Sequence, residues 1–273
     1  MNDGHWDRIY LSPHLDDAAL SCGGLIYQQT HAGERVLVVT LFAGSPPDDE
    51  ITPFARELKA RWGGATDPVA VRRREDLAAW RALGAEGLHL PYYDCVYRSD
   101  PRTGEAYYPD VASIFADLHP AERDWRRDLL AALRERVADL CAARIVAPLT
   151  VGHHVDHILA QQMALELMRQ GCDVRFYEDY PYAGDAEAIG RALAPWPRGC
   201  WSVEAFYLNE AALAAKGDAV ACHASQISTF WPDVDAMRRA LRAQALAVGE
   251  GRYAERLWRL DPRCLPRDFT THG

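Results

Sequence analysis

The sequence predicts a single α/β domain built on a mostly parallel β-sheet with helices on both faces. Short apolar runs alternate with segments of helical length, beginning with a strand at Arg8 to Ser12, a helix at Asp16 to Ala32 and a strand at Arg35 to Phe42. Strands that alternate with helices are typical of parallel sheets, because each helix returns the chain to the same end of the sheet. The chain has 273 residues, of which 49% are hydrophobic, and this is enough for one large core.

The remaining elements follow the same rhythm along the chain. Pro13 follows the first strand, and Gly33 ends the first helix because glycine readily adopts the left-handed conformation that closes a helix. Further helices are predicted at 70–83, 125–142 and 155–169, and further strands at 87–90, 144–148, 173–177 and 201–208. From there to about residue 260 we predict mainly helix, and we assign the whole range 1–273 to one domain.

Two long connections interrupt this alternation, at 43–67 and at 92–123. Loops of this length in a compact domain are usually functional or disordered. The second begins at the edge where ligands bind in parallel sheets, so we expect it to form a wall or lid of a pocket. A subunit interface is the alternative, since aromatic side chains also serve association. This connection carries the tyrosines Tyr92, Tyr93, Tyr97, Tyr107 and Tyr108.

Composition and charge exclude several classes of protein. Thirty basic and 39 acidic residues give a formal net charge of −9, and no basic run could follow a phosphate backbone, so nucleic acid is not an expected partner. No apolar stretch reaches the roughly 20 residues of a membrane helix, and the N-terminus lacks a signal-peptide pattern, so we expect a cytoplasmic protein. The seven cysteines contain no C-x-x-C pair, and most are expected to be buried, reduced thiols.

Chemically versatile residues gather at the end of the first strand. The segment Pro13-His14-Leu15-Asp16-Asp17 stands where a dinucleotide-binding protein would have a glycine-rich phosphate loop. Two carboxylates there would repel a phosphate and attract a cation, and His14 and Asp17 can converge on one metal ion. Taken alone, Asp16 or Asp17 is as readily explained as the N-cap of the following helix.

A second cluster, Gly152-His153-His154-Val155-Asp156-His157, follows the strand that ends at Pro148 and opens the next helix. In a parallel sheet it lies at the same edge as His14. His154 and His157 are three residues apart and therefore share one face of the first helical turn. Such a concentration of polar groups is unusual for a core or a solvated surface, and it favours a metal site at the carboxyl ends of the strands.

Together the two motifs resemble those of the PIG-L/LmbE-like deacetylases, zinc-dependent N-acetylglucosaminyl deacetylases marked by P-H-x-D-D near the N-terminus and H-x-D-H past the middle. The resemblance spans about residues 7–230. It implies a Rossmann-like fold and one zinc ion bound by His14, Asp17 and His157. It also implies that Asp16 is the general base and that His154 stabilises the developing oxyanion.

The chemistry of these residue types agrees with that assignment. Three protein ligands leave positions open for water and a substrate carbonyl, as in catalytic rather than structural zinc sites. Zinc lowers the pKa of a bound water to about 7, and Asp16 can accept its remaining proton. Asp156 is expected to orient the imidazole of His154. The resemblance further suggests that Arg72 and Asp94 contact sugar hydroxyls, although the run Arg72-Arg73-Arg74 leaves the register of the arginine open.

The sequence therefore predicts a metal-dependent hydrolase that removes an N-acetyl group from an N-acetylglucosamine-type substrate. A zinc hydrolase of another N-acyl compound or of an ester is the alternative. A binding module without turnover is disfavoured, because every position of both motifs is filled. The same ligand set also suits iron(II), cobalt or manganese. The expected partner is a small N-acylated molecule, and homo-oligomerisation stays open.

Overall fold

The computed structural model of the chain describes residues 5–46, 52–61 and 67–265. Its strands are β1 (Arg8–Ser12), β2 (Val36–Thr40), β3 (Glu86–His89), β4 (Arg144–Pro148), β5 (Val174–Tyr177), β6 (Trp201–Tyr207) and β7 (Ala254–Leu260). Its helices include α1 (Asp17–His31), α2 (Pro53–Arg61), α3 (Pro68–Ala82), α4 (Trp125–Arg136), α5 (Val155–Arg169), α6 (Ala186–Leu193), α7 (Glu210–Cys222), α8 (Ala224–Phe230) and α9 (Val234–Val248).

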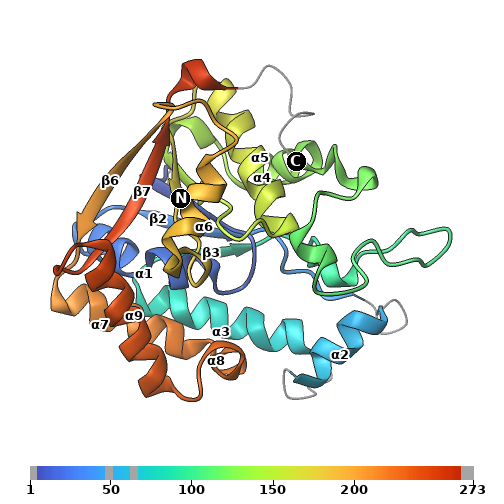
Figure 1. Cartoon of the computed structure of the whole chain (residues 1–273), viewed down its shortest axis with the longest axis horizontal. Helices are drawn as coiled ribbons and strands as arrows, with labels where there is room; N and C mark the ends of the chain where they lie inside the picture. Colours follow the sequence, from blue (N-terminus) through green and yellow to red (C-terminus); the bar gives the residue numbers. More distant parts are fainter. Residues whose placement is uncertain (1–4, 47–51, 62–66, 266–273) are drawn as a thin grey trace.

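The strands form one seven-stranded sheet in the order β3-β2-β1-β4-β5-β7-β6 (Figure 1). The strands β1 to β5 are mutually parallel, and β1 lies between β2 and β4 with Ser12 opposite Thr40. Every residue of β2 is buried, as expected for a strand covered on both faces. The predicted mostly parallel α/β sheet is confirmed, and the chain segments that follow β1, β4 and β5 meet at one edge.

Helices cover both faces of this sheet, also as predicted. Successive residues of β1 point to opposite sides: Ile9 and Leu11 pack with α4, α5 and α6, whereas Tyr10 packs with α1, α3, α7 and α9. Figure 1 shows these two helical layers above and below the strands. None of the helices in the described ranges is long and apolar enough to cross a membrane.

The sequence prediction was wrong at the C-terminal part of the sheet. Helices α7, α8 and α9 agree with it, but the predicted helical stretch ends in β7, which inserts between β5 and β6 and runs antiparallel to both. Arg256 and Trp258 of β7 donate hydrogen bonds to the carboxylate of Glu178, just after β5. This strand is therefore stabilised by partners distant in sequence, which local patterns do not report.

Three smaller differences concern the helices: one ends earlier than predicted, and two were not predicted. The helix predicted at 125–142 ends at Arg136, and the chain then turns through Asp139, which has a left-handed φ of 50°. The helices α2 and α6 lie in stretches where no helix was predicted. In α6, Asp185 caps the N-terminus by accepting from the backbone N–H of Glu187, a signal that the short apolar pattern did not reveal.

The expectation of mostly reduced cysteines was also wrong. Cys141 and Cys172 form one disulfide, and Cys200 and Cys264 form another, with sequence separations of 31 and 64. The first pair joins segments just before the parallel neighbours β4 and β5. The second joins the start of β6 to the segment after its antiparallel partner β7. Each pairing follows from strand adjacency, which the cysteine spacing alone did not show.

Candidate active site

The turn between β1 and α1 carries three of the predicted site residues. The hydroxyl of Ser12 donates to the carbonyl of His14 (2.7 Å) and accepts from the N–H of Ala18 (3.1 Å), so it ties the two ends of the turn together. Asp16 has a φ of 156°, a strained value for a residue with a Cβ atom. The adjacent carboxylates of Asp16 and Asp17 consequently have different partners.

The start of α5 brings the second motif to the same place. Thr150, Gly152 and His153 all have positive φ angles, and a Cβ atom at Gly152 would lie 2.6 Å from the ring of Tyr182, so glycine is required there. This tight coil brings the imidazole of His154 to a centroid distance of 4.8 Å from that of His14. The same two loops therefore meet as predicted from the strand ends.

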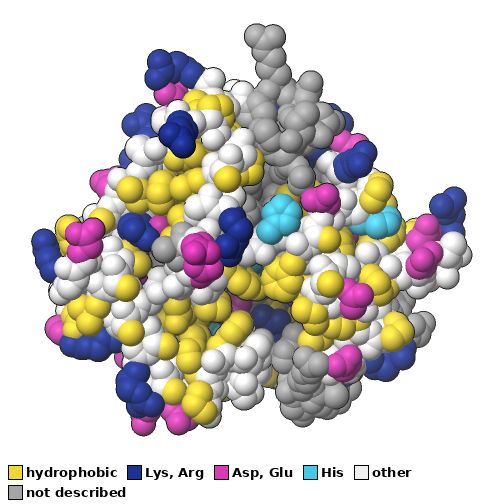
Figure 2. All heavy atoms as spheres, viewed as in Figure 1, with side chains coloured by type: hydrophobic (Ala, Val, Ile, Leu, Met, Phe, Trp, Pro, Cys, Tyr) yellow, Lys and Arg dark blue, Asp and Glu magenta, His cyan; other side chains and the backbone are white. Residues whose placement is uncertain are grey.

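Asp17 lies between the imidazoles of His14 and His157. Its Oδ2 atom is 3.2 Å from His14 Nδ1 and 3.3 Å from His157 Nε2. In a tetrahedral zinc site with bonds of about 2.0–2.2 Å, neighbouring ligand atoms are about 3.3–3.6 Å apart. Both spacings to Asp17 Oδ2 lie close to that range. Figure 2 shows the surface of the protein hollowed near the centre of this view.

Each of these two imidazoles has a carboxylate at its other nitrogen. Asp156 Oδ2 lies 2.9 Å from His14 Nε2, and Asp179 Oδ1 lies 2.5 Å from His157 Nδ1. Carboxylates in this position fix the orientation of metal-binding histidines. Asp179 was not among the predicted site residues. Its signal was present, because it directly follows the end of β5 at the binding edge.

The contacts of Asp156 differ from the expected ones. Its carboxylate was expected to orient His154, but it contacts His14 instead. What Asp156 offers His154 is its backbone N–H, which donates to His154 Nδ1 (3.2 Å). Since Nδ1 accepts this bond, the neutral imidazole of His154 carries its proton on Nε2.

Three combinations of described side chains bring one possible ligand atom from each residue within 4.8 Å of one another, and none of the three contains Asp17. They are His14 with His154 and His157, Cys95 with His154 and Asp156, and His14 with Asp94 and Asp156. We favour the set with Asp17, because its carboxylate oxygen bridges two imidazole nitrogens at ligand spacing. In the other two sets that contain a carboxylate, Asp156 is already engaged by neighbouring side chains.

The electrostatics of the cluster favour a positive charge at its centre. Burial by itself would lower the pKa of His157, but the carboxylates of Asp17 and Asp179 outweigh it and raise the pKa to about 9. Burial would also lower the pKa of His14, but the carboxylates of Asp94, Asp156 and Asp17 raise it well above its usual value. A proton or a metal ion at this position would meet the same demand for positive charge.

The carboxylate of Asp16 pairs with a side chain of α3 rather than with His14 or His157. Its Oδ2 atom lies 3.5 Å from Nη2 of Arg72, which also donates to the carbonyl of Leu15. Burial raises the pKa of Asp16 to about 7, although Arg72 opposes the shift. Arg72 is buried, whereas Arg73 and Arg74 are exposed, so the structure places Arg72 in the register that faces the site.

The 92–123 connection contributes directly to the walls of this site. Asp94 lies 3.8 Å from His14 Nε2, Cys95 Sγ lies 3.8 Å from His154 Nε2, and the ring of Phe115 meets that of His154 edge-on. Neither Cys95 nor Phe115 was predicted, since neither belongs to a motif. The connection is thus a wall of the site, in line with one of the two expectations for it.

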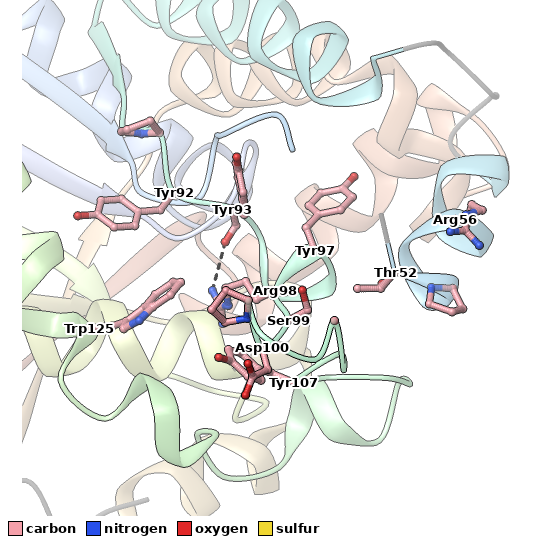
Figure 3. A pocket seen from close by; sticks show the side chains of 14 residues that line it. Thr52, Arg56, Tyr92, Tyr93, Tyr97, Arg98, Ser99, Asp100, Tyr107 and Trp125 are labelled. Carbon is pink, nitrogen blue, oxygen red and sulfur yellow. Dashed lines mark hydrogen bonds between the residues drawn. The ribbon is translucent and has the colours of Figure 1, made fainter. Parts of the chain in front are cut away.

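The same connection also lines a cavity of about 870 Å³. None of His14, Asp17 and His157 lines it, so it is separate from the ligand cluster. Figure 3 shows aromatic side chains and Arg98 around its wall, with Thr52 and Arg56 on one side. Its aromatic lining consists of Tyr92, Tyr93, Tyr97, Tyr107 and Trp125. Tyr108 is not part of it, because that side chain is buried and its hydroxyl donates to Glu122.

Comparisons with known proteins point in one direction. The family model described as PIG-L, GlcNAc-PI de-N-acetylase, matches residues 9–168. The chain is 31% identical over 198 residues to 2'-N-acetylparomamine deacetylase of Niallia circulans, covering 67% of this chain and 70% of that protein. It is 33% identical over 184 residues to the enzyme of the same name from Streptomyces fradiae, covering 66% of this chain and 59% of that protein.

Solved structures agree over a larger share of the chain. The deacetylase of the A40926 pseudoaglycone superposes with a TM-score of 0.75 at 28% identity, covering 96% of this chain and 99% of that one. A zinc-inhibited form of teicoplanin deacetylase superposes with a TM-score of 0.76 at 28% identity, covering 92% of this chain and 96% of that one.

Proposed function

Because the chain belongs to the PIG-L family of de-N-acetylases, we propose that it hydrolyses the N-acetyl group of an N-acetylglucosamine-type sugar, releasing acetate and the free amine. Membership of the family makes it a carbon–nitrogen amide hydrolase. The choice of an acetylated amino sugar follows the two curated relatives, both 2'-N-acetylparomamine deacetylases. The observation that carries the proposal is the placement of Asp17 Oδ2 within 3.3 Å of both His14 Nδ1 and His157 Nε2.

His14, Asp17 and His157 would hold the divalent ion, zinc being our choice for this ligand set. Bound there, it would polarise the acetyl carbonyl and acidify a water molecule. Asp156 and Asp179 hold the two histidines in the orientation that this requires. Neither histidine can rotate without losing a carboxylate partner in a buried environment.

The remaining residues supply proton transfer and charge stabilisation. Asp16 accepts a proton from the attacking water and later returns it to the leaving amine, while Arg72 keeps its carboxylate in place. The Nε2–H of His154 donates to the oxygen on which negative charge develops, since its Nδ1 is engaged by the N–H of Asp156. Asp94, beside His14, is placed to accept from a sugar hydroxyl.

The direct test is hydrolysis of a panel of N-acetylated amino sugars, N-acyl amino acids and simple esters by the metal-loaded protein. We expect amine release from the amino sugars, with loss of activity on treatment with a chelator and recovery on adding Zn²⁺. Colorimetric detection of primary amine measures both. Preferential turnover of esters or of N-acyl amino acids would instead favour a hydrolase of another bond on the same site.

We propose further that the aromatic cavity receives the part of the substrate that extends beyond the acetylated sugar. Tyr93 and Tyr97, which flank Asp94 in sequence, line the cavity, whereas Asp94 itself faces His14. Aromatic faces suit the apolar faces of sugar rings, and their hydroxyl groups suit the polar edges. The volume of about 870 Å³ lies within the usual range for ligand pockets.

Tyr107→Ala separates this role from a subunit interface. Tyr107 stacks on His119 and lines the cavity, so its removal takes away one aromatic face with little loss of core. We expect a higher KM for an acetylated disaccharide and an unchanged KM for the acetylated monosaccharide. Tyr207→Ala, at an exposed tyrosine of β6, is the matched control. An unchanged KM for both substrates together with a changed mass in light scattering would support the interface instead.

A further inference from the structure

Arg98, a buried arginine of the 92–123 connection, is linked through Asp156 to His14, one of the proposed metal ligands. Arg98 lies just after a short 3-10 helix, Cys95–Tyr97, and is only 3% exposed. Its Nη1 lies 2.7 Å from Asp156 Oδ1, an ion-pair contact that is not a linear hydrogen bond. Its Nη2 donates to Glu122 Oε2 (3.0 Å), and its Nε lies 2.7 Å from Glu122 Oε1.

Asp156 extends this contact to the site. Its other oxygen, Oδ2, lies 2.9 Å from His14 Nε2 and also accepts from the N–H of Cys95 (3.0 Å). Both oxygens of the carboxylate are therefore engaged, one by Arg98 and one by His14. The result is an unbroken series of contacts from Glu122 through Arg98 and Asp156 to the imidazole whose Nδ1 faces Asp17.

The residues around Arg98 explain why the contacts from Glu122 to His14 require an arginine at this position. Glu122 and Asp156 are both fully buried, so two carboxylates share one cation away from water. The guanidinium carbon also lies 5.0–5.4 Å from the rings of Phe42, Tyr108 and Trp125. A planar guanidinium can contact two carboxylates at once and stack on aromatic rings, whereas an ammonium group provides a single point of charge. Without the arginine, Asp156 would have no fixed partner on its Oδ1 side.

We propose that Arg98 is a positioning residue that acts through Asp156 to hold the His14 imidazole with Nδ1 directed at the metal site. Arg98 contacts Asp156 and Glu122 rather than His14, Asp17 or His157, and its side chain also lines the aromatic cavity (Figure 3). This inference rests on the proposed function only in taking His14 as a metal ligand. It assigns a part in metal binding to a residue outside both sequence motifs.

Metal affinity is the decisive measurement, because it reports on His14 without requiring a substrate. Carboxylate partners of metal-binding histidines typically change metal affinity by about 10–100-fold when removed. We expect Arg98→Met to weaken Zn²⁺ binding within that range in competition with a chromophoric chelator, and to alter the visible absorption of the Co²⁺-substituted protein. Arg98→Lys should recover part of the affinity, since it restores charge but not the two-sided contact.

A matched control separates positioning from general stability. Lys216 of α7 forms a similarly buried pair with Glu255 of β7 (2.7 Å), and Glu255 accepts from the N–H groups of Gly24 and Leu25 in the middle of α1. We expect both Lys216→Met and Arg98→Met to lower the melting temperature of the metal-free protein, but Lys216→Met should leave metal affinity and the Co²⁺ spectrum unchanged. Tyr108→Phe removes only the hydroxyl that donates to Glu122 and provides a milder variant should Arg98→Met fail to fold.

The possible failures are distinguishable. If the wild-type protein binds no divalent ion, the proposed function itself fails. If the wild type binds Zn²⁺ and His14→Ala abolishes binding, but Arg98→Met and Arg98→Lys bind as tightly as the wild type with unchanged Co²⁺ spectra, the positioning role is overturned and the metal site stands. If Arg98→Met does not fold, unchanged affinity in both Arg98→Lys and Tyr108→Phe also overturns it.

Discussion

Replacing Asp16 by asparagine is expected to lower kcat by about 100-fold or more, because an amide of the same shape cannot accept the proton of the attacking water. Metal content should stay at the wild-type level, since the Asp16 carboxylate faces Arg72 and not His14 or His157. Steady-state kinetics on an acetylated amino sugar and elemental analysis of the same preparation measure both quantities.

A carboxylate at the opposite edge of the sheet serves as the control. Asp173 pairs with Arg144 just before β5, so Asp173→Asn also removes one negative charge but should leave kcat unchanged. A near-normal kcat in Asp16→Asn would exclude Asp16 as the base. Loss of metal in that variant would instead make it a ligand and overturn the assignment of Asp17.

Removing a metal ligand is expected to abolish activity through loss of the metal itself. His14→Ala, Asp17→Ala and His157→Ala should each reduce bound metal well below the one ion per chain expected of the wild type, because a three-ligand site rarely tolerates the loss of one donor. Mass spectrometry of the metal content, after dialysis against a weak chelator, measures the effect.

The neighbouring histidine provides the comparison. His153 belongs to the same motif, but its side chain is 51% exposed and lies near Asp117. His153→Ala should therefore keep both metal and activity. Unchanged metal content in all three ligand variants would refute the site, and loss of metal in His153→Ala would show that the second motif binds through a different histidine.

The part of the fold that could be predicted from the sequence is the part that local patterns determine. The alternation of strands and helices predicts the parallel sheet, and the common edge of parallel strands predicts that His14 and His157 lie close together. The strand β7 was not predicted, because its pairing partners, β5 and β6, lie far from it in sequence. The two disulfides were missed for the same reason.

Within the site, the sequence predicts which residues take part better than it predicts which of them contact one another. The motifs contain His14, Asp17 and Asp156, but only the folded structure shows that the carboxylate of Asp156 contacts His14 rather than His154. Side-chain rotamers decide this, and spacing along a helix does not. Arg98 carries no local signature at all, because its importance depends on the burial of Glu122 and Asp156 around it.

The position of β7 also bears on the order in which the sheet is assembled during synthesis. β6 leaves the ribosome before α7, α8 and α9, yet its strand partner among the described residues is β7, which follows all three helices. Until then β6 has no strand to pair with, and β5, which positions Asp179 beside His157, has an open edge. An unpaired edge invites pairing with other chains. A chain whose synthesis stops before β7 therefore exposes the edges of both β5 and β6, although its two histidine motifs have already been synthesised.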